Sequence, residues 1–120
     1  MPICQIKTNY KFDDDKKREF LSHLNLELAD ILDKPLPAVM SMISEEYMYM
    51  NSSDDTILFA EFRYLRDFSS AEEKRIFLKN FSDRALEIFQ SFMKVDPHRV
   101  YMQFTEMTRE GAWKYTEQEN

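Results

Sequence analysis

Two amphipathic segments, each lying between two short apolar segments, constrain the fold more than any other feature of the sequence. The apolar residues of both segments recur at helical spacing. The first helix is expected to end at Lys34-Pro35 and the second at Asp96-Pro97, because a residue that precedes proline is pushed out of the helical region. The two stripes consist of Phe20, Leu21, Leu24, Leu28, Ile31 and Leu32, and of Phe77, Leu78, Phe81, Ala85, Ile88, Phe89 and Phe92.

The apolar segments around these helices are typical of β-strands. Strands are predicted over residues 3–8, 38–44, 56–64 and 99–105, with a short strand-like piece at 47–50 and a turn at 51–55. Acidic and serine residues mark the helix starts, as in the capping box at Ser70-Ala71-Glu72-Glu73. A strand, a helix and a second strand joined by short loops form a βαβ unit with parallel strands.

The order of these elements predicts one α/β domain over residues 1–120, built from two βαβ repeats. The first half covers residues 1–50, the second covers 56–106, and a C-terminal segment follows at 107–120. Within that segment, residues 117–120 are expected to form a loose tail.

The second and third strands carry apolar residues on both faces, which predicts burial on both sides of the sheet. Two helices on one side of a four-stranded sheet leave its other face uncovered. Because another copy of the same chain is the simplest cover, the pattern predicts a symmetric homo-oligomer. The residues concerned are Val39, Ile43, Met40 and Met42, and Ile57, Phe59, Leu58 and Phe62.

Composition excludes several classes of function. The net charge of −6 argues against nucleic acid or an anionic membrane as the main partner, and no apolar run is long enough to span a membrane. A single glycine leaves no phosphate-binding loop, and two isolated histidines with one cysteine give no metal site. We expect no cofactor. The lone Cys4 excludes an internal disulfide and favours a reducing compartment, the cytoplasm, with non-classical secretion left open.

The N-terminal residues Met1-Pro2 suggest a chemical role. Met1 before a small residue is normally removed, which would leave Pro2 with a secondary amine at the start of a strand. An α-amine has a pKa near 8, and burial beside another cation would lower that pKa and make the amine a base at neutral pH. The alternative is that this common start has no functional meaning.

Several motifs in sequence order give the chain a resemblance to a known family. They are Met1-Pro2 with a strand ending in Thr8-Asn9, then Lys34-Pro35, then Pro97-His98-Arg99-Val100-Tyr101-Met102-Gln103-Phe104, then Glu106-Met107 and Trp113. The sequence resembles the macrophage migration inhibitory factor family of the tautomerase superfamily. The resemblance implies a four-stranded mixed sheet with two helices on one face, in a homotrimer whose sheets face inward. It also implies cofactor-independent keto–enol tautomerisation of phenylpyruvate-like or dopachrome-like substrates.

The same resemblance assigns roles to individual residues. It makes Pro2 the catalytic base and Lys34 the neighbouring cation that lowers the pKa of its amine and holds a substrate carboxylate. The backbone N–H of Leu65 would help to bind that carboxylate, while Tyr101 and Gln103 would come from the adjacent subunit.

Departures from the family pattern leave alternatives open. Arg66 stands where the family has glycine, and we expect it to add a second carboxylate contact. Residues 50–56 lack the family's glycine and proline. The alternative function is a trimeric binding or signalling module with little or no catalysis, and a hydratase or dehalogenase of the same superfamily is a further alternative if Arg66 lies in the pocket. The missing cysteine pair predicts no thiol-redox activity.

Overall fold

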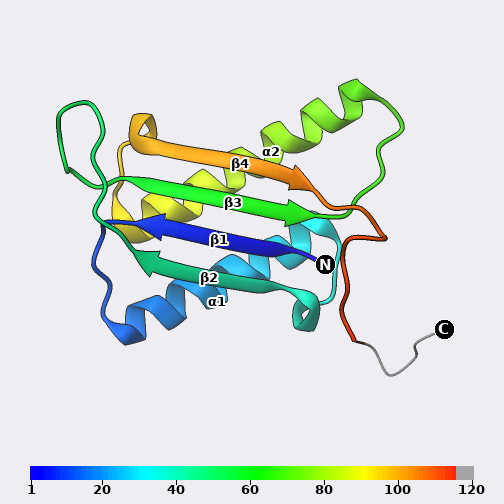
Figure 1. The fold of residues 1–120 in the computed structure, drawn as a ribbon, viewed down its shortest axis with the longest axis horizontal. Coiled ribbons are helices and arrows are strands. Elements are labelled where there is room, and N and C mark those ends of the chain that lie inside the picture. Colours follow the sequence, from blue (N-terminus) through cyan, green and yellow to red (C-terminus); the bar gives the residue numbers. More distant parts are fainter. Residues whose placement is uncertain (116–120) are drawn as a thin grey trace.

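The computed structural model describes residues 1–115 and forms a sheet with two helices on one face (Figure 1). The expected tail at 117–120 lies outside the described residues. The elements in order are β1 (Ile3–Thr8), α1 (Asp14–Leu32), the 3-10 turn η1 (Leu36–Ala38), β2 (Met40–Glu45), β3 (Leu58–Tyr64), α2 (Ala71–Met93), the 3-10 turn η2 (Pro97–Arg99) and β4 (Val100–Glu106).

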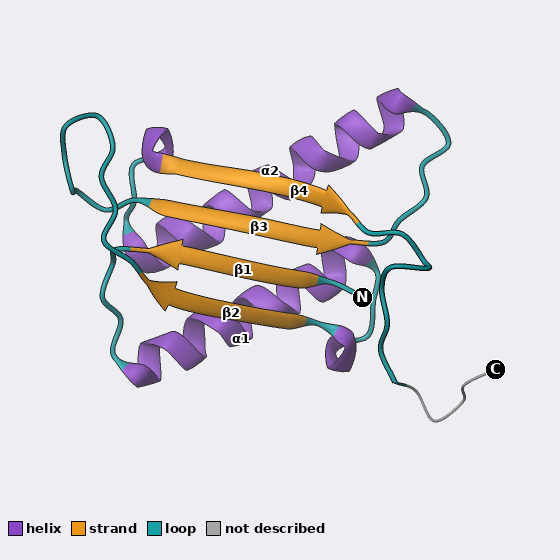
Figure 2. Cartoon of the chain, in the orientation of Figure 1, coloured by secondary structure: helices purple, strands orange, loops and turns teal. Residues whose placement is uncertain are grey.

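The sheet has the strand order β2-β1-β3-β4 and is mixed. β1 pairs in parallel with β2, and β3 pairs in parallel with β4, whereas the central pair β1 and β3 is antiparallel. Each half is thus one βαβ unit, and the two units join through their first strands (Figure 2). The expected four-stranded mixed sheet with two helices on one face is confirmed.

Both helices begin as their sequences indicate, and each ends ahead of the residue pair expected to stop it, α1 at Leu32 and α2 at Met93. The Asp13 side chain accepts a hydrogen bond from the Lys16 backbone N–H, and the Ser70 side chain accepts one from Glu73, so each cap satisfies a free donor of the first turn. At the other ends, Asp33 and Lys94 adopt the left-handed conformation, with φ of 53° and 54°. This conformation returns the chain to the sheet without a glycine.

The core lies between the sheet and the helices, because side chains alternate along each strand. Cys4, Ile6 and Thr8 of β1 point toward the helices and are fully buried. Met40 and Met42 of β2, on the other face, are 54% and 37% exposed, and Tyr101 of β4 is 66% exposed. One face of the sheet therefore stays uncovered in the single chain, with apolar side chains on it.

The loop between β2 and β3 differs from the prediction, because residues 47–50 do not form a strand. Met50 and Ser53 exchange backbone hydrogen bonds of 3.0 and 3.1 Å around Asn51 and Ser52, whose φ angles are 52° and 54°. A short strand needs a partner strand, and β2 has already ended at Glu45. The expected turn at 51–55 is thus present as a tight two-residue turn.

Two side chains from other elements hold this loop in place. Arg99 donates to the carbonyl oxygens of four loop residues, at 3.0 to 3.2 Å. Asn9 accepts from the Ile57 backbone N–H at 2.8 Å and donates to the Asp54 carbonyl at 2.8 Å. The four carbonyls that Arg99 contacts belong to Met50, Ser53, Asp55 and Thr56. Over residues 1–115, no helix is long and apolar enough to cross a membrane.

Candidate functional site

The start of β1 is built into the fold. The Pro2 ring is fully buried, and its carbonyl accepts a hydrogen bond of 3.0 Å from the backbone N–H of Met40. The next residue, Ile3, is paired with Met40 of β2 and with Arg63 of β3. The first residues of the chain are therefore held by the sheet, whereas most chain ends are poorly ordered.

A pocket of about 470 Å³ opens beside this end of the chain. It lies where the N-terminus, η1 and the segment 107–115 approach one another in Figure 1. No acidic residue lines it, although the chain as a whole carries a charge of −6. Its lining consists of Met1, Ile3, Asn25, Pro37, Ala38, Val39, Met40, Ser41, Trp113 and Lys114.

The amine at this pocket is the α-amine of Met1. Burial lowers the pKa of this amine from its ordinary value of 8.0, and the positive charge of Lys34 lowers it further. Both effects act in the same direction, because each disfavours the protonated form. The pocket thus contains an amine that is more readily neutral than an ordinary chain end.

Lys34 and Leu65 reach this region from the two neighbouring elements. Lys34 follows the left-handed Asp33, and its backbone N–H donates to the Ala29 carbonyl at 2.9 Å, which fixes it at the end of α1. Leu65 directly follows β3. Since Ile3 pairs with Arg63 in antiparallel register, Leu65 falls opposite Met1 when that register is continued. The fold therefore brings Pro2, Lys34 and Leu65 to one end of the sheet.

Arg66 points elsewhere. Its guanidinium carbon lies 4.4 Å from the centre of the Phe77 ring and 6.0 Å from that of Phe68. It lines a separate pocket of about 240 Å³ together with Asp30 and Arg84. In the single chain the structure does not bring Arg66 into the pocket at Met1.

Tyr101 and Gln103 also lie away from the N-terminal pocket of their own chain. Both are on the uncovered face of β4, and Tyr101 pairs with Phe59, which in turn pairs with Lys7 near the far end of β1. Tyr101 lines a separate pocket of about 180 Å³ with Tyr49. These two residues therefore do not meet Pro2 within one chain.

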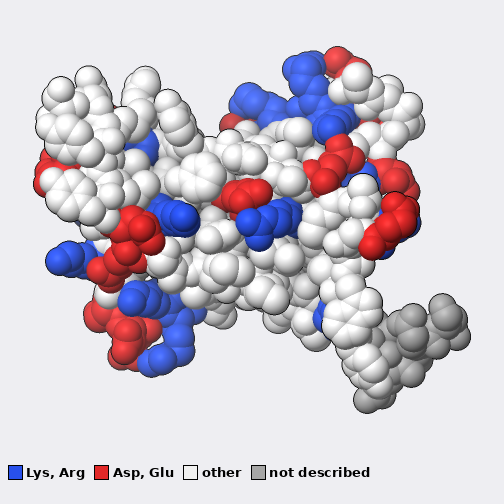
Figure 3. Space-filling model, in the orientation of Figure 1, with Lys and Arg blue, Asp and Glu red and all other residues white. Residues whose placement is uncertain are grey.

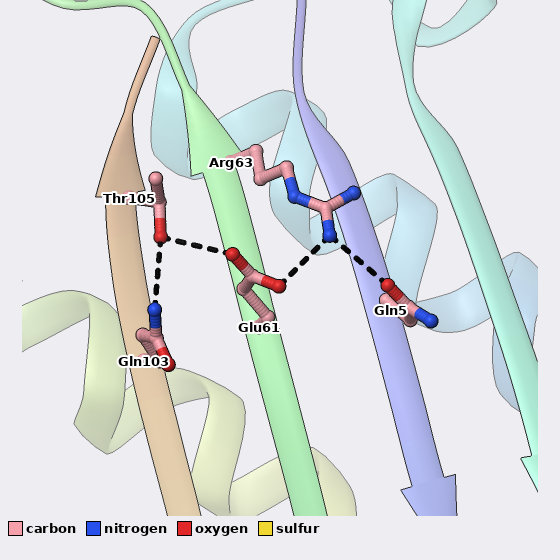
Figure 4. A network of polar contacts seen from close by, with 5 residues as sticks. All are labelled: Gln5, Glu61, Arg63, Gln103 and Thr105. Carbon is pink, nitrogen blue, oxygen red and sulfur yellow. Dashed lines mark hydrogen bonds and ion pairs between the residues drawn. The ribbon is translucent and has the colours of Figure 1, made fainter.

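A line of polar contacts crosses the uncovered face (Figure 4). Arg63 donates to Gln5 at 3.1 Å and to Glu61 at 2.8 Å, and Thr105 donates to Glu61 at 3.0 Å. The hydrogen bond from Arg63 lowers the pKa of the Glu61 carboxyl. The end member is Gln103, whose side-chain amide donates to Thr105 at 3.4 Å.

Figure 3 shows that the surface over the strands is mostly uncharged, with one acidic and one basic group side by side near its centre. Residues 1–115 contain no group of three or more His, Cys, Asp or Glu side chains that could hold a metal ion.

Several solved structures share this architecture. The macrophage migration inhibitory factor from Giardia lamblia superposes with a TM-score of 0.76 at 24% identity, covering 88% of this chain and 98% of that one. The macrophage migration inhibitory factor-like protein from Entamoeba histolytica gives a TM-score of 0.81 at 16% identity, covering 96% and 95%. The homologue from Prochlorococcus marinus gives 0.78 at 17% identity, covering 95% of each chain. The chain has the macrophage migration inhibitory factor fold.

No protein-family model matches the chain, and no curated protein matches its sequence. The solved structures confirm the resemblance drawn from short sequence motifs, and they do so at the level of the macrophage migration inhibitory factor fold. Two of those motif residues, Asn9 and Arg99, hold the loop between β2 and β3 in this chain.

Sequence reasoning missed several residues that line the N-terminal pocket of this macrophage migration inhibitory factor fold. Trp113 was recognised only as a motif residue, and Lys114 beside it was not singled out. Ser41 was visible as a polar residue in an apolar strand, which is a weak signal. Asn25 gave no signal, because a polar residue beside a helical stripe is ordinary.

Proposed function

We propose that this chain is a cofactor-independent keto–enol tautomerase in which Pro2, exposed as the N-terminus by removal of Met1, acts as the general base. The substrates are phenylpyruvate-like or dopachrome-like. The observation that carries the proposal is the amine in the N-terminal pocket. Burial and the positive charge of Lys34 both lower the pKa of this amine. The fold shared with macrophage migration inhibitory factors supports the same reaction class.

Removal of Met1 is essential to the proposal. With Met1 in place, the nitrogen of Pro2 is an amide and cannot take a proton, and the free amine is the primary amine of Met1. Without Met1, the amine moves one residue closer to β1, to a residue whose ring is fully buried. Greater burial disfavours the charged form of the amine more strongly.

The net result of the reaction is that one proton leaves the carbon next to the substrate carbonyl and one proton is added to the carbonyl oxygen. The Pro2 nitrogen takes the proton from the carbon next to the substrate carbonyl, and the electron pair of the broken C–H bond moves to form the enolate. The enolate oxygen then takes a proton from solvent, and the pyrrolidinium of Pro2 returns its own proton to solvent. Lys34 and the backbone N–H of Leu65 hold the substrate carboxylate, which places the reacting carbon near the base.

A homotrimer completes the site in this proposal. Tyr101 and Gln103 lie on the uncovered face, away from the amine of their own chain, and would reach the amine of a neighbouring copy. The apolar side chains exposed on that face, Met40, Met42 and Tyr101, support assembly with the sheets facing inward. Tyr101 and Gln103 would then provide polar groups near the substrate.

A trimeric binding or signalling module is the second candidate. It is favoured by the placement of Arg66 over Phe77, away from the pocket, which leaves the substrate carboxylate with fewer cations than the sequence implied. This module would keep the pocket and the assembly without turnover.

The test combines intact mass with a tautomerase assay. The mass of the purified protein reports whether Met1 is absent, and the absorbance of the enol of phenylpyruvate reports turnover. We expect a chain that begins at Pro2, with activity that Pro2→Gly reduces at least a hundredfold. Pro97→Gly, at a proline of η2 that does not line the pocket, is the matched control. A mature protein that keeps Met1, or activity that survives Pro2→Gly, would refute the proposal.

A further inference from the structure

The pocket lined by Arg66 lies between the two helices and is separate from the pocket at Met1. It has a volume of about 240 Å³ and is formed by the end of α1, the middle of α2 and the segment after β3. Among the described residues, the two pockets share no lining residue, and the reaction proposed above makes no use of this one. Part of its lining is apolar and consists of Ile31, Phe77 and Phe81.

Arg66 brings a positive charge without an ionic partner to this pocket. Its side chain is half-buried, and the guanidinium carbon lies 4.4 Å from the centre of the Phe77 ring. Glu73, in the first turn of α2, accepts a hydrogen bond of 3.2 Å from the Ser69 backbone N–H and forms no ion pair with Arg66. Within residues 1–115, Arg66 has no hydrogen bond at all, so the N–H donors at the edge of its planar guanidinium are free to bind a ligand.

Arg84 adds a second guanidinium, whose orientation is fixed by α1. It donates to Glu27 from Nε at 3.0 Å and from Nη2 at 2.6 Å, and to Asp30 from Nη2 at 2.8 Å. In the described part of the chain, its Nη1 has no hydrogen-bond partner, and the side chain is 41% exposed. Asn80, one turn earlier on the same face of α2, is exposed and lines the pocket as well. Three residues thus offer accessible N–H donors to one pocket.

The balance of charge around the pocket selects the class of ligand. Glu27 and Asp30 already neutralise Arg84, so Arg66 is the cation of this lining that has no carboxylate partner within residues 1–115. One such cation matches a ligand with one negative charge, whereas the second charge of a phosphate would meet the carboxylate of Asp30. A guanidinium also fits a carboxylate, which it binds through two parallel hydrogen bonds. The apolar part of the lining favours a ligand with an apolar body.

We propose that the pocket between the helices binds a small monocarboxylate with an apolar body, whose carboxylate is held by Arg66 and by Nη1 of Arg84, with Asn80 at the rim. The apolar body lies against the two phenylalanine rings of α2. This site does not depend on the removal of Met1 or on tautomerase activity, because none of its residues belongs to the proposed catalytic site.

The test titrates the full chain with phenylacetate, which has one carboxylate and one ring. The nitrogen-15 NMR signals of the Asn80 side-chain amide and of Arg66 Nε–H report this pocket, whereas the indole N–H of Trp113 reports the pocket at Met1. We expect saturable shifts of the first two signals. Phenylacetamide, which has the same shape without the charge, should bind at least about tenfold more weakly, the size of a hydrogen bond to a charged group. Acetate and inorganic phosphate, which lack the ring, should each bind at least about threefold more weakly.

Three variants assign the binding to the named side chains. Arg66→Met removes the charge but keeps a long apolar side chain beside Phe77, and it should weaken phenylacetate about tenfold. Arg66→Lys keeps the charge without the planar fork and should bind with intermediate affinity. Asn80→Ala, at an exposed helix position, should weaken binding about threefold. Arg75→Met removes an exposed ion pair with Glu72 in the same helix and is the control. Should Arg66→Met fail to fold, Arg66→Lys and the comparison with phenylacetamide decide.

The other outcomes overturn the site. Equal affinity for phenylacetate and phenylacetamide shows apolar binding without recognition of the carboxylate, and tighter binding of phosphate shows a site for inorganic anions. A shift of the Trp113 signal alone places the ligand only in the pocket at Met1, and binding that survives every variant at Arg66 and Asn80 also refutes the proposal. Loss of tautomerase activity in Pro2→Gly should leave the shifts at Asn80 unchanged, so the two proposals fail separately.

Discussion

The guanidinium of Arg66 lies 4.4 Å from the centre of the Phe77 ring, on the helix side of the sheet. A cation over an aromatic face at this separation is attracted by the electrons of the ring. Phe77 belongs to α2, so this contact ties the segment after β3 to the helix that follows it. The residue that the sequence marked as a second cation for the substrate thus has a partner within its own chain.

Arg66→Ala should separate these two roles. We expect the free energy of unfolding to fall by about 0.5–1 kcal/mol, the size of an exposed cation–π contact, with the Michaelis constant for phenylpyruvate unchanged. Chemical denaturation and steady-state kinetics measure the two quantities. Arg75→Ala, which removes an exposed ion pair within α2, is the control. A rise of about tenfold in the Michaelis constant would instead assign Arg66 to the substrate carboxylate.

Lys34→Ala should change the pH dependence of the proposed activity. Lys34 lowers the pKa of the α-amine, so its removal raises that pKa. Because the base acts in its neutral form, the rising limb of kcat/KM should move to higher pH, and activity should fall more at pH 6 than at pH 9. Loss of the carboxylate contact should also raise KM about tenfold. Lys11→Ala, near the far end of β1, should do neither, and an unchanged pH profile in Lys34→Ala would contradict the electrostatic role.

Arg99→Leu should destabilise the fold and loosen the loop between β2 and β3. The guanidinium holds four backbone carbonyls of that loop, and hydrogen bonds from charged groups are stronger than neutral ones. We expect a loss of about 2–3 kcal/mol in the free energy of unfolding, with faster proteolysis at residues 50–56. Arg109→Leu, whose only described partner is the exposed Asp67, should cost much less. Similar losses in the two variants would show that the loop contacts add nothing.

Ser52→Gly should stabilise the protein. Asn51 and Ser52 are in the left-handed region, where glycine has no steric penalty. Asparagine followed by glycine is the preferred pair for a two-residue turn of this kind. We expect the free energy of unfolding, measured by thermal or chemical denaturation, to rise by up to about 1 kcal/mol. Ser52→Ala keeps the penalty and should give no gain, so equal stability of the two variants would argue against backbone strain at this turn.

The Cys4 thiol should be unreactive in the folded protein. Cys4 is fully buried in the middle of the core, and burial raises the pKa of its thiol well above the ordinary value. Because the thiolate is the reactive form, labelling with a thiol reagent at pH 8 should proceed at the rate of unfolding. Labelling that is complete within seconds in native buffer would show that β1 opens far more easily than its burial implies.

Most of the fold could be predicted from the sequence, because local signals and tertiary structure agree along most of the chain. The apolar stripe around Leu24 and the capping box at Ser70 each describe an element that packs against the same sheet. The piece at 47–50 is the exception. Its alternation of tyrosine and methionine has the pattern of a strand, but the single chain offers that segment no strand to pair with.

The site was less predictable than the fold. Pro2 and Lys34 carry signals in the sequence, since one is a proline at the chain start and the other ends a helix before a proline. The direction of the Arg66 side chain depends on Phe77, and the presence of Asn25 and Ser41 in the lining of one pocket depends on how α1 lies over β2. Neither of these tertiary arrangements produces a recognisable pattern in the sequence.

The contacts of Arg99 also bear on the order in which the molecule assembles. The arginine is the last residue of η2, directly before β4, whereas the carbonyls that it binds lie 43 to 49 positions earlier in the chain. The loop between the two halves therefore cannot adopt its final conformation until β4 has joined the sheet. Its final shape is a late event of folding, and synthesis of the chain must pass η2 before the connection between the halves becomes rigid.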